Sequence, residues 1–290
     1  MSAVTPGSVV KSGKVLDCAG RKLDLGTPRV MGILNVTPDS FSEGGNFLSV
    51  DKALAHARRM VADGASIVDV GGESTRPGAA LVSISKEIGR VVPVIEALCA
   101  ELPVIISVDT SRPDVMAAAV AAGAGMINDV RALLSDDALA AAADSGAAVC
   151  LMHMQGNPRT MQNNPRYGDV VGEVMTFLRH RVAACVDAGI ARQRLVIDPG
   201  FGFGKSLAHN LELLKRLDLF HELQLPILVG MSRKSMIGRV LDKEVGDRLV
   251  GGIACAVLAV WQGASVIRTH DVRETVEAVR MCHAVVAGGF

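Results

Sequence analysis

Apolar residues are clustered in short runs along the chain, and four of these runs follow a glycine: Gly64, Gly123, Gly146 or Gly263. Glycine at such a place is typical of the left-handed position after a helix, from which a buried strand can begin. The runs do not alternate apolar with polar residues, which is typical of parallel strands covered on both faces. Eight strands are predicted, beginning near Val30, Ser66, Val104, Met126, Ala147, Leu195, Ile227 and Ser265.

Between the predicted strands lie stretches whose apolar residues have helical spacing. In residues 51–62, for example, Ala53, Ala57 and Met60 fall on one face. Strict alternation of strand and helix predicts an α/β fold, a single-domain (β/α)8 TIM barrel over residues 1–290, for which about 250 residues are usual. An open, doubly wound sheet is the alternative. The clearest helices are predicted at 51–62, 113–122, 170–188, 207–217, 247–262 and 272–286.

The remaining length lies in front of the barrel, where residues 9–25 predict a short β-hairpin that turns near Ala19 and Gly20. Residues 1–10 show no charged start followed by an apolar run, so no signal peptide is predicted and we expect a cytoplasmic protein. The longest apolar run, Leu249–Trp261, is shorter than the roughly 18–20 residues that a membrane span needs. It predicts a helix buried in the core or against a partner subunit.

Composition narrows the class of protein. Of 290 residues, 49% are hydrophobic, which is enough for a large core and excludes a disordered chain. Thirty Lys and Arg residues balance thirty Asp and Glu residues, so nothing indicates a nucleic-acid or acidic-membrane partner. The six cysteines form no Cys-x-x-Cys pair, and we expect them to be reduced thiols packed in the core.

Polar side chains follow the predicted strands, at the end of the barrel where ligands bind. Any one of them is explained equally well as a turn former or a helix cap. A shared site explains all eight strand ends better. These strand-end residues are Asn35, the segment 71–78, Asp109, Asn128, His153, Asp198, the segment 232–234, and Arg268 with His270.

Two kinds of chemistry are indicated. The carboxylates of Asp109 and Asp198, with the amide of Asn128, suit a flat, nitrogen-rich heterocycle that offers paired N–H donors. Arg268 and His270, with Arg76, suit an anion such as phosphate. Asn35 could bind Mg²⁺, which accepts a single protein oxygen beside phosphate and water.

The segment 200–206 is no phosphate-binding loop of either common type. Pro199 stands where the first glycine of a Walker A motif belongs, and Lys205 replaces the third glycine of G-x-G-x-x-G.

Five segments between residues 30 and 270 together resemble bacterial dihydropteroate synthase, a pterin-binding TIM-barrel family. They are Asn35–Ser42, the G-G-E-S-T-R-P-G of 71–78, the D-P-G-F-G-F-G-K of 198–205, Ser232–Ser235 and Arg268–His270. Thr269 stands where this family is expected to have an apolar residue. In a strand, its side chain points away from those of Arg268 and His270, so we expect the chemistry to be unaffected.

The resemblance implies an enzyme that condenses (7,8-dihydropterin-6-yl)methyl diphosphate with 4-aminobenzoate, giving 7,8-dihydropteroate and diphosphate in folate synthesis. It implies no nucleic acid or membrane partner, inhibition by sulfonamides, and a homodimer. The catalytic residues would be Asp109, Lys234, Arg268 and His270. Matched by motif, the pterin would be held by Asp109, Asn128, Asp198 and Lys234, the diphosphate by Asn35, Arg268 and His270 with Mg²⁺ at Asn35, and the aminobenzoate by Thr75, Arg76, Pro77 and Ser235. Phe203 is a further expected substrate-binding residue.

Departure of diphosphate before attack by the amine is the favoured order, because the pterin ring can stabilise a methylene cation. Two alternatives share part of the pattern. A pterin-dependent methyltransferase would need the pterin-holding Asp and Asn residues but neither the diphosphate site nor the segment 74–78. A catalytically silent paralogue would have lost loop residues such as Arg76 and Lys234, which are present.

Overall fold

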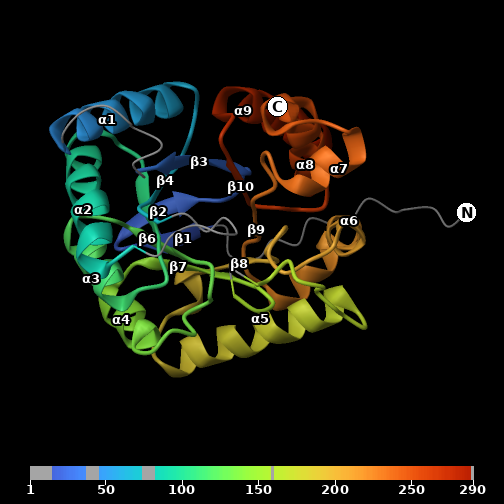
Figure 1. Ribbon diagram of the computed structural model, residues 1–290, viewed down its shortest axis with the longest axis horizontal. Helices are drawn as coiled ribbons and strands as arrows, with labels where there is room; N and C mark the ends of the chain where they lie inside the picture. Colours follow the sequence, from blue (N-terminus) through green and yellow to red (C-terminus); the bar gives the residue numbers. More distant parts are fainter. Residues whose placement is uncertain (1–14, 37–45, 74–81, 158–159, 289–290) are drawn as a thin grey trace, which may run out of the picture.

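The computed structural model describes residues 15–36, 46–73, 82–157 and 160–288. Within them, eight parallel strands form one sheet in the order β8-β7-β6-β5-β4-β3-β10-β9 (Figure 1). A parallel bridge between Ile197 and Ile227 joins its two ends and completes a barrel. The predicted barrel is confirmed, and the open sheet was the wrong alternative. The strands are β3 (Arg29–Asn35), β4 (Ile67–Gly71), β5 (Ile105–Asp109), β6 (Met126–Asp129), β7 (Ala148–Met152), β8 (Leu195–Asp198), β9 (Leu228–Val229) and β10 (Val266–Thr269).

Helices surround this barrel, as Figure 1 shows. Their bounds are α1 (Asn46–Ala62), α2 (Ile84–Glu101), α3 (Pro113–Ala121), α4 (Ala138–Ser145), α5 (Val170–Asp187), α6 (Leu207–Lys215), α7 (Ser235–Leu241), α8 (Leu249–Trp261) and α9 (Val272–Ala287). The sequence pattern did not single out α2, α4 or α7. Helix α2 contains Pro93 in its interior, which hides a helix from sequence inspection. Among the described helices, none is long and apolar enough to span a bilayer.

The predicted hairpin closes one end of the barrel. Strands β1 (Val15–Cys18) and β2 (Arg21–Asp24) pair antiparallel around a turn at Ala19 and Gly20, both with positive φ. Leu16, Cys18 and Leu23 pack against the inward side chains near the amino ends of the barrel strands. A Cβ at Gly125 would lie 3.1 Å from the Cys18 carbonyl oxygen, so the hairpin is in close contact with the base of β6. The carboxyl end of the barrel is therefore the end available to a ligand.

Alternate residues of each strand face opposite sides, and this alternation positions the site. In β4, Val68 and Val70 belong to the apolar layer between strands and helices, whereas Ile67 belongs to the barrel interior. Asp69 has the same parity as Ile67 and is fully buried, so it lies inside the barrel. Apolar side chains fill the interior near the hairpin, and polar ones replace them toward the carboxyl end.

Candidate active site

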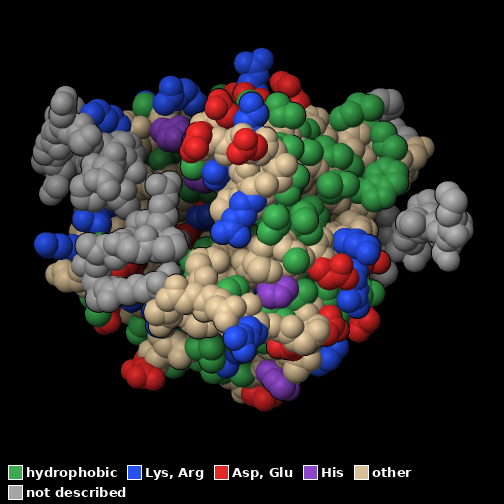
Figure 2. Space-filling view, turned by 45° about the vertical axis from the view of Figure 1, so that its right-hand side comes forward, with side chains coloured by type: hydrophobic (Ala, Val, Ile, Leu, Met, Phe, Trp, Pro, Cys, Tyr) green, Lys and Arg blue, Asp and Glu red, His purple; other side chains and the backbone are tan. Residues whose placement is uncertain are grey.

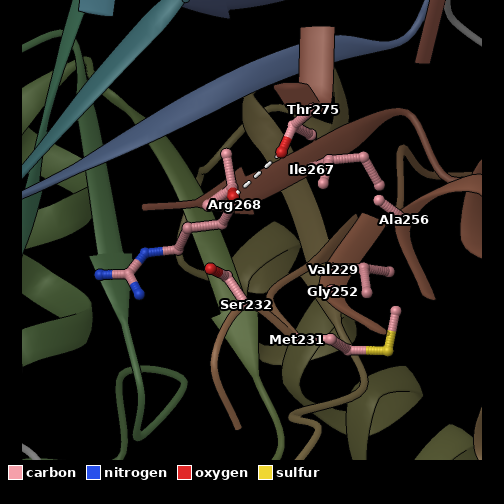
Figure 3. Close-up of a pocket in the computed structure, with 9 residues that line it drawn as sticks. Val229, Met231, Ser232, Gly252, Ala256, Ile267, Arg268 and Thr275 are labelled. Atoms are coloured by element: carbon pink, nitrogen blue, oxygen red, sulfur yellow. Dashed lines mark hydrogen bonds between the residues drawn. The ribbon is translucent and has the colours of Figure 1, made fainter. Parts of the chain in front are cut away.

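An ion-pair network occupies the carboxyl end of the barrel. The Arg268 guanidinium donates from Nε to Asp69 Oδ2 at 2.6 Å and from Nη2 to Asp109 Oδ2 at 2.8 Å. The Asn128 amide donates to the same Asp69 oxygen at 3.0 Å. Figure 3 shows the Arg268 side chain on the opposite side of β10 from Ile267, which points toward Ala256 of α8. Arg268 thus reaches across the interior and links strands β4, β5 and β10.

The charged groups in this network shift one another's pKa values. Burial raises the pKa of Asp109 to about 7, and the charge of Asp69 adds to this while Arg268 opposes it. Burial disfavours the charged form of Arg268, but Asp69 and Asp109 more than offset this and raise its pKa above the ordinary value. Arg268 is therefore a permanent cation, while Asp109 can change protonation state near neutral pH.

Asp69 was missed by the sequence analysis, which considered only residues at strand ends. It lies two residues before the end of β4, and it accepts hydrogen bonds from both Arg268 and Asn128. The available signal was one carboxylate within the otherwise apolar strand Ile67–Gly71. A charged residue on a strand covered on both faces requires a buried partner, and Arg268 is that partner.

Asp198 and Lys234 lie at the neighbouring strand ends. Asp198 ends β8, is 6% exposed, and accepts a hydrogen bond from the Gly200 N–H at 2.7 Å. Lys234 occupies the N-cap position of α7, donates to the Phe201 carbonyl, and has its Nζ 4.6 Å from the centre of the Phe203 ring. Burial lowers the pKa of Lys234 to about 8, while Asp198 opposes that shift; burial raises the pKa of Asp198, and Lys234 opposes it.

The predicted diphosphate residues meet the network from the β3 and β10 side. Asn35 ends β3, and a Cβ built on the neighbouring Gly71 would lie 3.5 Å from Asn35 Oδ1 and 3.7 Å from Asp109 Cβ. His270 follows β10, with its Nδ1 3.1 Å from the Ser232 hydroxyl, which also accepts the His270 backbone N–H at 3.2 Å. Glycine at position 71 leaves the space between the Asn35 and Asp109 side chains open.

A second ion-pair cluster joins the two residues that flank segment 74–81. Arg112 donates to the Val82 carbonyl at 2.6 Å and to Glu73 Oε1 at 3.1 Å. It also pairs with the buried Glu87, whose other oxygen accepts from the Thr110 hydroxyl at 2.7 Å. The end of β4 and the start of α2 are thereby fixed to the loop after β5.

Most predicted site residues converge. Asn35, Asp109, Asn128, Asp198, Phe203, Lys234, Arg268 and His270 all lie at or just beyond the carboxyl ends of the barrel strands. Ser235 is exposed at the first position of α7, next to Lys234. Thr75, Arg76 and Pro77 lie outside the described residues.

Within the described part of the chain, no group of three or more His, Cys, Asp or Glu side chains could hold a metal ion. The arrangement presents buried carboxylates and an amide beside several cations, which suits a polar heterocycle carrying an anionic substituent.

Comparison with known proteins agrees with this chemistry. A family model described as pterin binding enzyme matches residues 31–270. The dihydropteroate synthase of Escherichia coli strain K12 is 56% identical over 268 residues, which are 92% of this chain and 95% of the relative. That of Haemophilus influenzae is 50% identical over 262 residues, covering 90% of this chain and 95% of the relative.

Solved structures show the same likeness. A Yersinia pestis dihydropteroate synthase in a sulfonamide drug complex superposes with a TM-score of 0.89 at 52% identity, over 94% of this chain and 99% of that one. A Xanthomonas albilineans dihydropteroate synthase with 4-aminobenzoic acid also gives a TM-score of 0.89 at 52% identity, over 95% and 99%.

Proposed function

The chain belongs to the dihydropteroate synthase family of pterin-binding enzymes, and from this membership we propose how its residues perform the reaction. The enzyme is a transferase that condenses (7,8-dihydropterin-6-yl)methyl diphosphate with 4-aminobenzoate, forming 7,8-dihydropteroate and diphosphate. The observation that carries the assignment of roles is the convergence of Asp109, Asn128, Asp198 and Arg268 inside one end of the barrel.

Asp198 and Asn128 are the proposed anchors of the pterin ring. The buried Asp198 carboxylate keeps one oxygen bonded to the Gly200 N–H, and its second oxygen can accept N–H donors of the pterin. Asn128 uses its amide nitrogen on Asp69, which leaves its carbonyl oxygen as an acceptor for the ring. Lys234, a donor only, would face a ring oxygen, and Phe203 beside it would contact a face of the bicycle.

Asp109 and Arg268 would act on the charge that develops during the reaction. Loss of diphosphate leaves positive charge on the pterin methylene, and the Asp109 carboxylate stabilises that charge. Arg268, held between Asp69 and Asp109, would stabilise the negative charge on the departing group together with His270. The neutral arylamine then attacks carbon without a strong base. The C–O bond to diphosphate breaks first, the C–N bond forms second, and the amine proton passes to solvent or diphosphate.

Mg²⁺ is the proposed cofactor. Asn35 Oδ1 is a neutral oxygen ligand near the opening above Gly71, and a single protein oxygen suffices for an ion that keeps waters and phosphate oxygens. The donor fits, because the Asn35 amide oxygen is the kind of hard ligand that Mg²⁺ prefers. When bound, Mg²⁺ supplies neutralisation of the diphosphate charge.

The aminobenzoate site is proposed from the family resemblance at Thr75, Arg76, Pro77 and Ser235. Similar enzymes have been solved with each class of ligand, the Xanthomonas albilineans one with 4-aminobenzoic acid and the Yersinia pestis one with a sulfonamide drug. We therefore propose that sulfonamides compete with 4-aminobenzoate on this enzyme.

A homodimer is proposed from an apolar surface on α7, α8 and α9. Figure 2 shows hydrophobic side chains gathered on this face, and Val250, Met281 and Trp261 are 78%, 65% and 50% exposed. A second copy of the chain is the proposed partner, since such a patch on a soluble enzyme marks an interaction surface. We propose a cytoplasmic location because all six cysteines are free thiols.

The direct test of the function mixes purified enzyme, Mg²⁺ and the pterin diphosphate, with and without 4-aminobenzoate. Release of diphosphate that depends on the amine, with formation of dihydropteroate, is expected. Asp198→Ala should abolish pterin binding, because the donors of the heterocycle lose their acceptor. Diphosphate release that does not depend on 4-aminobenzoate, or tight pterin binding by Asp198→Ala, would contradict the proposal.

A further inference from the structure

Lys205 is a buried cation that the reaction scheme does not use. Its side chain is almost fully buried, and its Nζ contacts four acceptors. Three are backbone carbonyl oxygens, of Gly200 at 2.9 Å, Phe203 at 3.0 Å and His153 at 3.3 Å. The fourth is His153 Nδ1 at 2.9 Å. These contacts join the segment 199–205 to itself and to the end of β7.

The contacts suit an ammonium ion. Carbonyl oxygens only accept hydrogen bonds, so a donor-only group satisfies them best. Burial, with the charge of Lys205 adding to it, lowers the pKa of His153 to about 3, so its imidazole is neutral and Nδ1 can accept. Burial lowers the pKa of Lys205 well below its ordinary value, and the charge of Asp198 opposes this. The four neutral acceptors around Nζ favour the donor-only ammonium form.

The segment around Lys205 follows a path that few residues allow. Gly200, Gly202 and Gly204 all have positive φ, between 62° and 78°. A Cβ at Gly200 would lie 1.8 Å from the His153 carbonyl oxygen, and one at Gly204 would lie 2.5 Å from that of Gln155. The chain therefore turns tightly against the end of β7, with the Gly200 and Phe203 carbonyls directed to Lys205 and the Phe201 carbonyl directed to Lys234.

Those donors connect the segment to the pterin residues. The Gly200 and Phe203 carbonyls are bound by Lys205, whereas the Phe201 carbonyl between them is bound by Lys234. The Gly200 N–H, on the peptide preceding the Gly200 carbonyl, binds Asp198. A shift of the segment would therefore move the hydrogen-bond partners of Asp198 and Lys234 together.

We propose that Lys205 is a positioning residue for the pterin site: by binding the Gly200, Phe203 and His153 groups, it holds segment 199–205 in the path that orients Asp198 and Lys234. This inference rests on the proposed function, because it assigns Lys205 a role toward the same pterin. A role in folding alone is the competing interpretation. Positioning predicts altered pterin recognition in a folded variant, and folding alone does not.

The charge of Lys205 gives a second readout. It lowers the pKa of Asp198, in addition to the larger effect of Lys234. Replacing Lys205 by a neutral residue should therefore raise the pKa of Asp198. Because pterin binding requires the ionised Asp198 carboxylate, the variant should lose pterin affinity at a higher pH than wild type when the solution is acidified.

The experiment compares Lys205→Met with Lys215→Met, which removes an exposed lysine at the end of α6 in the same part of the chain. Pterin itself is the probe, and its binding is measured across pH 5–8, which is roughly the range of a displaced carboxyl titration. Steady-state KM and kcat are measured for both substrates. Wild-type activity is recorded first, so failure of the proposed function is seen independently.

For Lys205→Met we expect the pterin Kd to rise roughly tenfold to a hundredfold, as for small misplacements of binding groups. The KM for 4-aminobenzoate should stay within about twofold, and the acid midpoint of pterin binding should move to higher pH. Lys215→Met should match wild type in all three. An active wild type with unchanged pterin Kd and midpoint in Lys205→Met would overturn the inference.

Lys205→Gln covers the case in which the methionine variant does not fold. Glutamine keeps N–H donors for the carbonyl groups but has no charge. If Lys205→Gln unfolds cooperatively, its pterin Kd and the acid midpoint of its pterin binding test the positioning role by the same criteria. If neither variant folds, Lys205 serves folding and the positioning role is refuted.

Discussion

Removing the carboxylate of Asp69 tests the buried network most sharply. Asp69→Ala leaves Arg268 with one carboxylate partner, Asp109 at 2.8 Å, and leaves the Asn128 amide without its acceptor. Deleting one member of a buried ion pair costs about 3–5 kcal/mol, and an unpaired amide adds about 1–3 kcal/mol. Two features make the expected loss of stability smaller than the sum of these two costs.

The first is the surviving Asp109 partner, together with an Arg268 side chain that is 21% exposed. The second is Asp69 Oδ1, which has no hydrogen-bond partner among the described residues, so its burial is itself unfavourable. We therefore expect a loss of about 2–4 kcal/mol in the free energy of unfolding. The pterin KM should rise as well, since Arg268 and Asn128 both lose their orientation.

The assay is urea unfolding followed by far-ultraviolet circular dichroism, with the midpoint compared at constant slope. Glu101→Ala is the matched control, because Glu101 also pairs with an arginine, Arg58, but on the surface. Its midpoint should stay close to wild type, since exposed ion pairs contribute little. An Asp69→Ala midpoint equal to that of wild type, or equal losses in both variants, would refute the reasoning.

Two further predictions concern pH and backbone geometry. Because burial raises the pKa of Asp109 to about 7, acidification through that pH should protonate Asp109 and lower kcat/KM for the pterin diphosphate. In Asp109→Asn this acid-side decrease of kcat/KM should be missing. If the decrease persists in the variant, another group is responsible for the titration. Gly204→Ala should lower the unfolding free energy by more than about 1 kcal/mol, because φ is positive and Cβ would lie 2.5 Å from the Gln155 carbonyl oxygen. Gly246→Ala, which meets no atom within 4 Å, is its control for the same urea midpoint, and equal midpoints would contradict the steric argument.

The fold was largely predictable, because strand–helix alternation leaves few topologies. The apolar runs, four of them led by a glycine, located all eight strands, and a bridge between Ile197 and Ile227 closes the predicted barrel. Helix α4, an alanine-rich segment of eight residues, and α7, of seven residues, are too short to show a helical periodicity. Their positions depend on packing against the barrel, which no local pattern records.

The site was predictable only at strand ends. Asp109, Asn128 and Asp198 converge because parallel strands place their carboxyl ends together. Asp69 and Lys205 were not predicted from the sequence as site residues, because their roles come from contacts with residues distant in sequence. Asp69 contacts Arg268, and Lys205 contacts His153. Arg268 was predicted to bind an anion, and its pairing with two carboxylates could not be derived from residue spacing.

A crystal structure of the enzyme with pterin bound tests the central claim most directly. Asp198 should accept hydrogen bonds from the amino and ring N–H groups of the pterin, with Asn128 and Lys234 on its other polar edges and its methylene directed toward Arg268. A pterin that binds outside the barrel, or that leaves Asp198 without contact, would contradict the account.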